Sequence, residues 1–411
     1  MSHHINYLNT SQFKTISLVM KFKAPLDEST MTARSVLSKL MQKTSQKYPT
    51  EIEMMNHLSE LYGANLYSSV LKQNNAHVIT LGVDIVNDKY LTDTNLLEEA
   101  FKLLHEVLYF PNVQNQAFNT RLVNQEKRLL KNKFLAIKEN IGQYGFYQLL
   151  HTMFPEDPNR LPSFGDEHQL NSIDGKTLYQ AFQKMKQEDE IYFYAVGEID
   201  SQEIESLYEK YIQLDSSSMV TLNDSRLVFN KETHYVEETI DTTQARLNIG
   251  MKFEVHHPDR SYFSFIVLNH LFGGDASSML FMNVREKLSL AYQIHSQIDA
   301  RSGLLYVLAG VNQQNKARAI ETIKNQFEMI KSGEIEEKMV DLSKRLIINS
   351  RLESTDRPKE FVETSFSNTF GSEISQEEWI EGIQAVTKAD IVDLAKTGYF
   401  HTIYCLVSEV Q

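Results

Sequence analysis

Residues 16–23 read ISLVMKFK and residues 247–255 read LNIGMKFEV. Both segments alternate apolar and polar residues with a period of two, which is typical of a half-buried β-strand. Both contain the tripeptide Met-Lys-Phe, which begins at Met20 in the first segment and at Met251 in the second, an offset of 251 minus 20, or 231. The recurrence of one strand at a fixed offset predicts an internal repeat.

The repeat continues through the next predicted helix, where Val36, Leu37 and Leu40 meet Val267, Leu268 and Leu271 at the same offset. Further along, residues 127–132 match residues 344–349 at a spacing of 217, and residues 173–178 match 386–391 at 213. The offset therefore shrinks along the chain, as insertions in the first copy require. We predict two copies of one folding unit.

Each copy has the same order of predicted elements: a strand, helices, a hairpin of two strands, two long helices, a further helix and a closing strand. The closing strands are predicted at 191–199 and 401–407. Strands that cluster in hairpins between helices predict an α+β fold of two homologous domains, each a mostly antiparallel sheet packed against helices. We place the domains at residues 1–215 and 240–411, with a polar linker at 216–239 that follows Asp215.

Composition narrows the functional classes. The 411 residues include 41 Lys and Arg and 54 Asp and Glu, which gives a net charge of -13. The sequence has no run of Lys and Arg of the kind that binds a phosphate backbone, so nucleic acid is not an expected partner. Cys405 is the single cysteine, which excludes an intrachain disulfide and a thiolate zinc site. The start of the chain does not have the pattern of a signal peptide, and the apolar stretch at 263–272 is too short for a membrane span. We expect a cytoplasmic protein.

A resemblance to a known family rests on residues 272–292, which read FGGDASSMLFMNVREKLSLAY. This segment resembles the C-terminal copy of the insulinase, pitrilysin and mitochondrial processing peptidase family, with its Gly-Gly turn, Ser-Ser pair and Arg-Glu-Lys followed by Leu-Ala-Tyr. Residues 195–200 resemble the strand that closes the family's first copy, and residues 385–390 the start of its last helix. The resemblance covers essentially the whole chain and implies the same duplicated α+β fold.

Active members of this family carry His-x-x-Glu-His on the first long helix, where the two histidines bind zinc and the glutamate activates a water. This chain has no such motif. The resemblance places Ser35 and Lys39 at the two histidines, Ser38 at the glutamate, and Lys133 at the third zinc ligand. A protonated lysine has no lone pair to donate and serines are weak uncharged ligands, so we expect no metal here.

Other catalytic centres are not apparent. No two of the 13 histidines stand at i and i+4, so an alternative protein-only zinc site is the less favoured reading. Cys405 lies in a predicted strand, which favours a buried apolar role over a nucleophile. Gly273 and Gly274 are expected to form a helix C-cap and turn, with a ligand contact as the alternative.

Arg285 and Tyr292 are the candidate substrate-binding residues. In the family, an Arg and a Tyr at this spacing reach from the C-terminal copy towards the substrate backbone near the zinc of the facing copy. Arginine offers a rigid fork of donors and tyrosine a hydroxyl, which can hold a peptide carbonyl. The alternative is structural: Arg285 pairs with Glu286, and Tyr292 only packs.

The resemblance therefore implies a non-catalytic subunit that pairs with a zinc-bearing homologue, or with itself, in peptide processing or maturation. No cofactor is expected in this chain, because zinc would belong to the partner. Two alternatives stay open: an active zinc-dependent peptidase with an unrecognised site, and a peptide-binding scaffold without a catalytic partner.

Overall fold

The computed structural model describes residues 5–92, 95–214, 220–222, 229–354, 357–371 and 373–408. The predicted start of the linker, residues 216–219, lies outside these ranges. The chain forms two compact units that are not contiguous halves of the sequence. Unit 1 comprises Met1–Leu135, Leu161–Ser225 and Thr355–Phe366, and unit 2 comprises Ala136–Arg160, Arg226–Ser354 and Ser367–Gln411.

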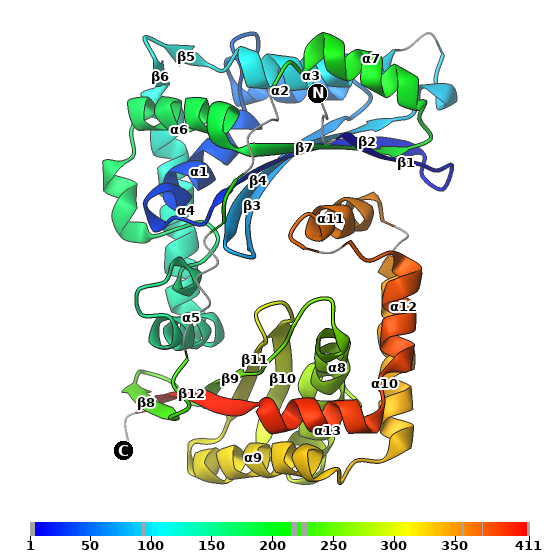
Figure 1. Cartoon of the computed structure of the whole chain (residues 1–411). Helices are drawn as coiled ribbons and strands as arrows, with labels where there is room; N and C mark the ends of the chain where they lie inside the picture. The colour runs from blue at the N-terminus through cyan, green and yellow to red at the C-terminus, as the bar shows by residue number, and fades with distance from the viewer. Residues whose placement is uncertain are drawn as a thin grey trace. The chain divides into compact units, whose positions relative to one another are not determined.

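Unit 1 is built on a five-stranded sheet in the order β1-β7-β2-β4-β3 (Figure 1). Its strands are β1 (Ile5–Asn9), β2 (Thr15–Pro25), β3 (Asn65–Gln73), β4 (Ala76–Val86) and β7 (Glu190–Gly197). All neighbours are antiparallel except β1 and β7. Met20 in the central strand β2 pairs with Leu81 of β4 and Phe193 of β7.

Unit 2 repeats this topology in its own sheet. Its strands are β8 (His234–Thr239), β9 (Ala245–Lys252), β10 (Ala291–Asp299), β11 (Leu304–Val311) and β12 (Tyr399–Val407), in the order β8-β12-β9-β11-β10. Met251 pairs with Leu305 of β11 and Phe400 of β12, the same relation that Met20 has in unit 1. The predicted α+β fold of two mostly antiparallel sheets is confirmed. The strand β8 occupies the end of the stretch that was predicted as linker, while the predicted domain boundaries themselves stay a prediction.

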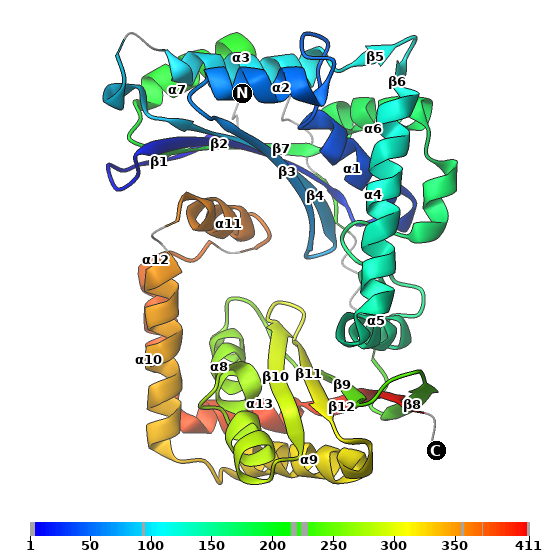
Figure 2. The same cartoon turned by 180° about the vertical axis from the view of Figure 1, so that it is seen from behind.

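The helices of unit 1 cover mainly one face of its sheet (Figures 1 and 2). They are α1 (Glu28–Met41), α2 (Glu51–Glu60), α3 (Leu96–Tyr109), α4 (Thr120–Glu139), α6 (Gly175–Glu188) and α7 (Ser201–Tyr211). The core lies between these helices and the sheet, where the Phe193 ring packs 5.7 Å from Phe101 and 4.9 Å from Tyr208, measured between ring centroids. The helix α4 begins only at Thr120, because Asn115 and Gln116 before it adopt positive φ in a turn between the two-residue strands β5 (Val113–Gln114) and β6 (Ala117–Phe118).

Local sequence explains where the helices of unit 1 begin. Asp27 is the N-cap of α1, and its carboxylate accepts a hydrogen bond from the backbone N–H of Ser29. Thr50 caps α2 in a reciprocal capping box with Glu53. These caps fix the start of α1, the helix that carries the degenerate site.

The helices of unit 2 include two π-helical segments. They are α5 (Ile141–Met153), α8 (Arg260–Asn269), the π-helices η4 (His270–Gly274) and η5 (Leu280–Lys287), α9 (Lys316–Ser332), α10 (Glu337–Ser354), α12 (Gln376–Ala385) and α13 (Lys388–Thr397). The core of unit 2 gathers apolar side chains of β9, α8 and α9, among them Met251, Phe265 and Phe327. Within the described residues, no helix combines the length and apolarity that a membrane crossing requires.

Each half of the sequence contributes one helix to the unit that is formed mainly by the other half. The helix α5 follows α4 in the first half but packs on β9 and β12 of unit 2. The approach is close, because a Cβ on Gly145 of α5 would lie 2.5 Å from Asn248, and a Cβ on Gly250 of β9 would lie 2.1 Å from the sulfur of Met153. A larger residue at either position would force the Asn248 or Met153 side chain to move, so glycine allows the close approach of helix and sheet.

The reciprocal helix is α11 (Pro358–Asn368), which comes from the second half and contributes to unit 1. It lies on the sheet face opposite α3 and α7 (Figures 1 and 2). The Phe366 ring packs edge-on against Tyr192 of β7, 5.4 Å between centroids, and Glu363 bonds the ammonium of Lys21, with Nζ 2.9 Å from Oε1. The Lys21 side chain is fully buried, so burial lowers its pKa while Glu363 opposes that shift.

We predict that Glu363→Gln destabilises the protein by about 1.5–3 kcal/mol, because it removes the charge-assisted bonds to a buried ammonium. Urea unfolding of the full chain measures the effect. Glu360→Gln on the same helix is the matched control, since none of the described contacts of Glu360 is an ion pair. Equal, small losses in both variants would contradict a stabilising role for the contact.

A second buried polar network joins α1 to β4. Arg34 donates from Nε to His77 Nδ1 at 3.0 Å, and His77 Nε2 lies 2.8 Å from the carbonyl oxygen of Ser163. Since Nδ1 accepts, Nε2 carries the proton and donates. Burial, with the charge of Arg34, lowers the pKa of His77 from 6.5 to about 3, so the imidazole stays neutral in the folded protein.

This network predicts a loss of stability in acid. Between pH 6.5 and 3 the unfolded chain binds a proton on His77 that the folded protein does not, so the free energy of unfolding falls as the pH falls, by at most about 1.4 kcal/mol per pH unit. His77→Gln should flatten this decline between pH 6.5 and 5, as compared by urea unfolding. The exposed His256 provides the control variant His256→Gln, and an unchanged slope in His77→Gln would refute the assignment.

Candidate functional site

The degenerate zinc positions lie on α1 and α4 of unit 1. Ser35 and Ser38 are buried, with 6% and 0% of their surface exposed, whereas Lys39 is half-buried and Lys133 of α4 is exposed. Burial, and after it the charge of Lys133, lowers the pKa of Lys39. The correspondence of these four residues to zinc-ligand positions stays a prediction.

Serine and glutamine side chains tie this face of α1 to β3. Ser38 Oγ lies 3.2 Å from Ser68 Oγ, and the backbone N–H of Ser68 donates to Gln42 Oε1 at 2.7 Å. The Lys39 ammonium donates to the backbone carbonyl of Ser68 at 2.6 Å. These side chains bond to one another and to the backbone of Ser68, so the contacts attach the helix to the strand.

The electrostatics of this face are dominated by ammonium groups. Burial is the main cause that lowers the pKa of Lys39, followed by the charge of Lys133. The Lys133 ammonium sits 3.9 Å from the centroid of the Phe164 ring, a cation–π contact. Within the described ranges, neither lysine has a carboxylate within 4.0 Å. Both cations therefore lack a direct counter-ion.

A buried carboxylate on α4 was not among the residues predicted from the sequence. Glu126 on α4 is 4% exposed and forms an ion pair with Lys43, 3.0 Å between Oε1 and Nζ. Glu126 precedes Lys133 by seven residues, two helical turns, so the spacing alone places both on one face of α4. Its partner Lys43 comes from the end of α1 and could be identified only from the fold.

These residues do not fit a zinc ion. Zinc needs three or four neutral imidazole, thiolate or carboxylate ligands. The site offers two buried hydroxyls and three ammonium groups, and its buried carboxylate is already paired. Across the described ranges, no group of three or more His, Cys, Asp and Glu side chains is placed to hold a metal ion.

The candidate substrate residues lie in unit 2 on η5 and β10. Arg285 keeps 41% of its side chain exposed, although its guanidinium stacks 4.5 Å from the Phe281 ring centroid and its Nε lies 3.6 Å from Glu286 Oε1. The predicted pairing with Glu286 is thus present but long and solvent-exposed, and such pairs contribute little to stability. Arg285 remains free to bind a second anion or carbonyl.

Tyr292 is 59% exposed at the start of β10. The pairing with β11 shifts register between Ala291 and Gln293, so Tyr292 occupies a β-bulge and is not packed into the core. Met282 and Leu288, near it in sequence, are 40% and 42% exposed. The exposure of the Tyr292 side chain therefore argues against a packing role.

The two glycines before this segment serve packing. They end the π-helix η4 with ordinary φ angles, and its C-cap is Asp275, so the expected glycine C-cap is wrong. A Cβ on Gly273 would lie 2.7 Å from Ser296 Oγ of β10. The π-helical turn passes too close to the strand for any side chain.

Comparisons with known proteins agree with this geometry. Residues 172–347 match the family model described as the peptidase M16 inactive domain. The chain is 32% identical over 401 residues to the probable inactive metalloprotease YmfF of Bacillus subtilis, with 97% of this chain and 94% of that protein covered. It is also 28% identical over 241 residues to the uncharacterized zinc protease YmxG of the same organism, covering 57% and 58% of the two chains.

Among solved structures, the fold is similar to that of a conserved protein from Enterococcus faecalis V583. The two share 30% sequence identity with a TM-score of 0.90, and 99% of this chain and 96% of that chain are covered. The similarity thus includes both units of the chain.

We predict that the purified chain binds no stoichiometric zinc, since lysines stand where ligands are needed. Elemental analysis after mild dialysis measures this, and about one zinc per chain would refute it. The triple variant Ser35→His, Ser38→Glu, Lys39→His should still bind zinc weakly, because Lys133 keeps the third position cationic. Adding Lys133→Glu to that variant should strengthen binding, and equal affinity in both would show that Lys133 does not face the site.

Proposed function

Because this chain belongs to the peptidase M16 family and lacks its His-x-x-Glu-His zinc motif, we propose that it is a non-catalytic subunit that works with a zinc-bearing homologue. The observation that carries the proposal is the contrast between the two units. Unit 1 has ammonium groups at the zinc-ligand positions, while unit 2 keeps Arg285 and Tyr292 exposed.

The family relatives support a paired arrangement. Bacillus subtilis carries both a relative named as a probable inactive metalloprotease and one named as a zinc protease. The first covers nearly the whole of this chain. We therefore infer that a zinc-bearing chain carries out the cleavage and that this chain, which keeps the fold without the zinc motif, assists it.

The role proposed for Arg285 and Tyr292 is to hold the backbone of a peptide substrate. A guanidinium and a phenolic hydroxyl can both donate to a carbonyl oxygen as it gains negative charge, the usual way in which amide cleavage is stabilised. The exposed Met282 and Leu288 would add apolar contacts to such a peptide. In this scheme the zinc and the attacking water belong to the partner.

The partner is a homologous zinc-bearing peptidase subunit, with a second copy of this chain as the alternative, and the site of action is the cytoplasm. Co-purification of the native chain followed by sequencing of the proteins that accompany it tests the partner directly. Recovery of a chain with His-x-x-Glu-His supports the proposal. Recovery of the chain alone, with no peptidase activity after any candidate is added, would favour a peptide-binding scaffold.

We predict that Arg285→Ala and Tyr292→Phe lower peptide turnover by the reconstituted pair by roughly a hundredfold, the usual scale for loss of an oxyanion donor. The melting temperature should hardly change, because both side chains are exposed. Peptide hydrolysis and thermal unfolding are measured on the same preparations.

Lys287→Ala, which removes an exposed cation from the same π-helix, is the matched control and should keep full turnover. Wild-type rates in the Arg285 and Tyr292 variants would remove the substrate role. A fall in melting temperature that parallels the loss of activity would assign these residues to folding instead.

A further inference from the structure

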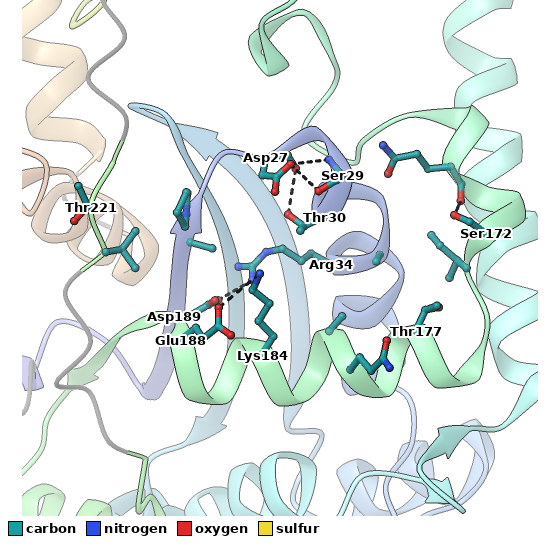
Figure 3. Close-up of a pocket in the computed structure, with 18 residues that line it drawn as sticks. Asp27, Ser29, Thr30, Arg34, Ser172, Thr177, Lys184, Glu188, Asp189 and Thr221 are labelled. Atoms are coloured by element: carbon teal, nitrogen blue, oxygen red, sulfur yellow. Dashed lines mark hydrogen bonds and ion pairs between the residues drawn. The ribbon is translucent and has the colours of Figure 1, made fainter.

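A cavity of about 590 Å³ lies in unit 1 between α1 and α6 (Figure 3). Its wall includes the end of β2 and the first turns of α1, and none of Ser35, Ser38 and Lys39 lines it. It is therefore separate from the degenerate zinc positions. Its size is in the range that holds a small organic ligand.

The floor of the cavity holds a buried ion pair. Asp189 is 3% exposed, and its Oδ2 lies 2.8 Å from Arg34 Nη1. The remaining nitrogens of Arg34 are engaged elsewhere, with Nε on His77 and Nη2 on the carbonyls of Phe22 and His77. Arg34 thus has little capacity to bind an incoming ligand.

Asp189 is under-supplied with hydrogen-bond donors. Its Oδ2 is buried and lacks a well-aligned hydrogen bond, despite the ion pair. Burial raises the pKa of this carboxyl to about 6, and the positive charges of Arg34 and Lys184 only partly oppose the shift. A further donor with positive charge would satisfy this carboxylate.

Four of the five hydroxyls of the wall already donate within the protein. Ser29 Oγ donates to Asp27 Oδ1 at 2.8 Å, and the hydroxyls of Thr30, Ser172 and Thr177 donate to backbone carbonyls. No described donor is bonded to the second carboxylate oxygen of Asp27. This oxygen is therefore an acceptor available to a ligand.

The charged residues that line the cavity also favour a cationic ligand. The lining contains the carboxylates of Asp27, Glu188 and Asp189 and the cations of Arg34 and Lys184, an excess of one negative charge. Lys184 is 58% exposed and lies 3.6 Å from Glu188, so this pair belongs to the mouth. Apolar surface completes the wall, from Ala24, Pro25, Ala33, Ile173 and Ala181.

We propose that this cavity binds a small organic amine with an apolar body. The ammonium donates to Asp189 at the floor, Asp27 adds attraction at the mouth, and the apolar part rests on the alanines and Ile173. This proposal is independent of the proposed pairing with a zinc-bearing subunit, so a negative result for either proposal leaves the other unaffected.

The test uses the full chain and two probes of equal shape, 2-phenylethylamine and its neutral analogue 2-phenylethanol, followed by calorimetry and NMR. The amine should bind saturably and at least about tenfold more tightly than the alcohol, the scale of one partly buried charge interaction. Absence of saturation, or equal affinity for the two probes, would overturn the proposal.

Two variants locate the binding. Asp27→Asn keeps the N-cap of α1, because asparagine caps as well as aspartate, and should weaken amine binding severalfold. Ala181→Phe fills the cavity and should abolish binding. Glu203→Gln, an exposed carboxylate on α7, is the control and should bind like the wild type. With circular dichroism confirming a folded chain, retained affinity in Ala181→Phe would place the amine elsewhere and reject the site.

Discussion

Each sheet of this protein is covered on one face by a helix from the other half of the sequence. Tight packing enforces this exchange in unit 2, where Gly145 and Gly250 allow α5 to lie directly against β9. In unit 1 an ion pair between a fully buried lysine and Glu363 of α11 performs the same task. Neither half of the sequence therefore contains all of its own unit.

This coupling explains how the fold can outlast the loss of metal ligands. The first helix remains attached through Arg34, which joins His77, Asp189 and the backbone of β2, and through the Ser38–Ser68 contact on its other side. None of these bonds requires a zinc ion. The positions predicted to correspond to metal ligands therefore need no metal for the packing of this helix, and Lys39 on α1 and Lys133 on α4 carry positive charge.

In unit 2, irregular backbone exposes the two candidate substrate-binding side chains. The π-helix η5 and the bulge at Tyr292 are irregular, and such irregularities often accompany functional sites because they redirect side chains away from regular packing. Arg285 and Tyr292 are both exposed as a result. A segment that served only the core would have no need to present them to solvent.

The sequence by itself determined the duplication, the α+β class and the absence of the zinc motif. The shared offsets of Met20 with Met251 and Leu37 with Leu268 are local patterns, and strand and helix periodicity is set by neighbouring residues. The placement of Lys39 and Lys133 at ligand positions rests on the family resemblance and stays a prediction. The order of the strands, with β2 and β9 central in the two sheets, came from the structure.

Only the tertiary structure decided which segments complete each unit and which side chains meet. No local pattern tells that α5 covers the second sheet, that Lys43 pairs with Glu126, or that Asp189 lies at the floor of a cavity. Likewise, only the structure shows that the π-helix η4 packs closely against β10, where a Cβ on Gly273 would lie 2.7 Å from Ser296 Oγ. These features depend on contacts between residues far apart in the chain, and periodicity reports only which face of an element is buried, not what covers it.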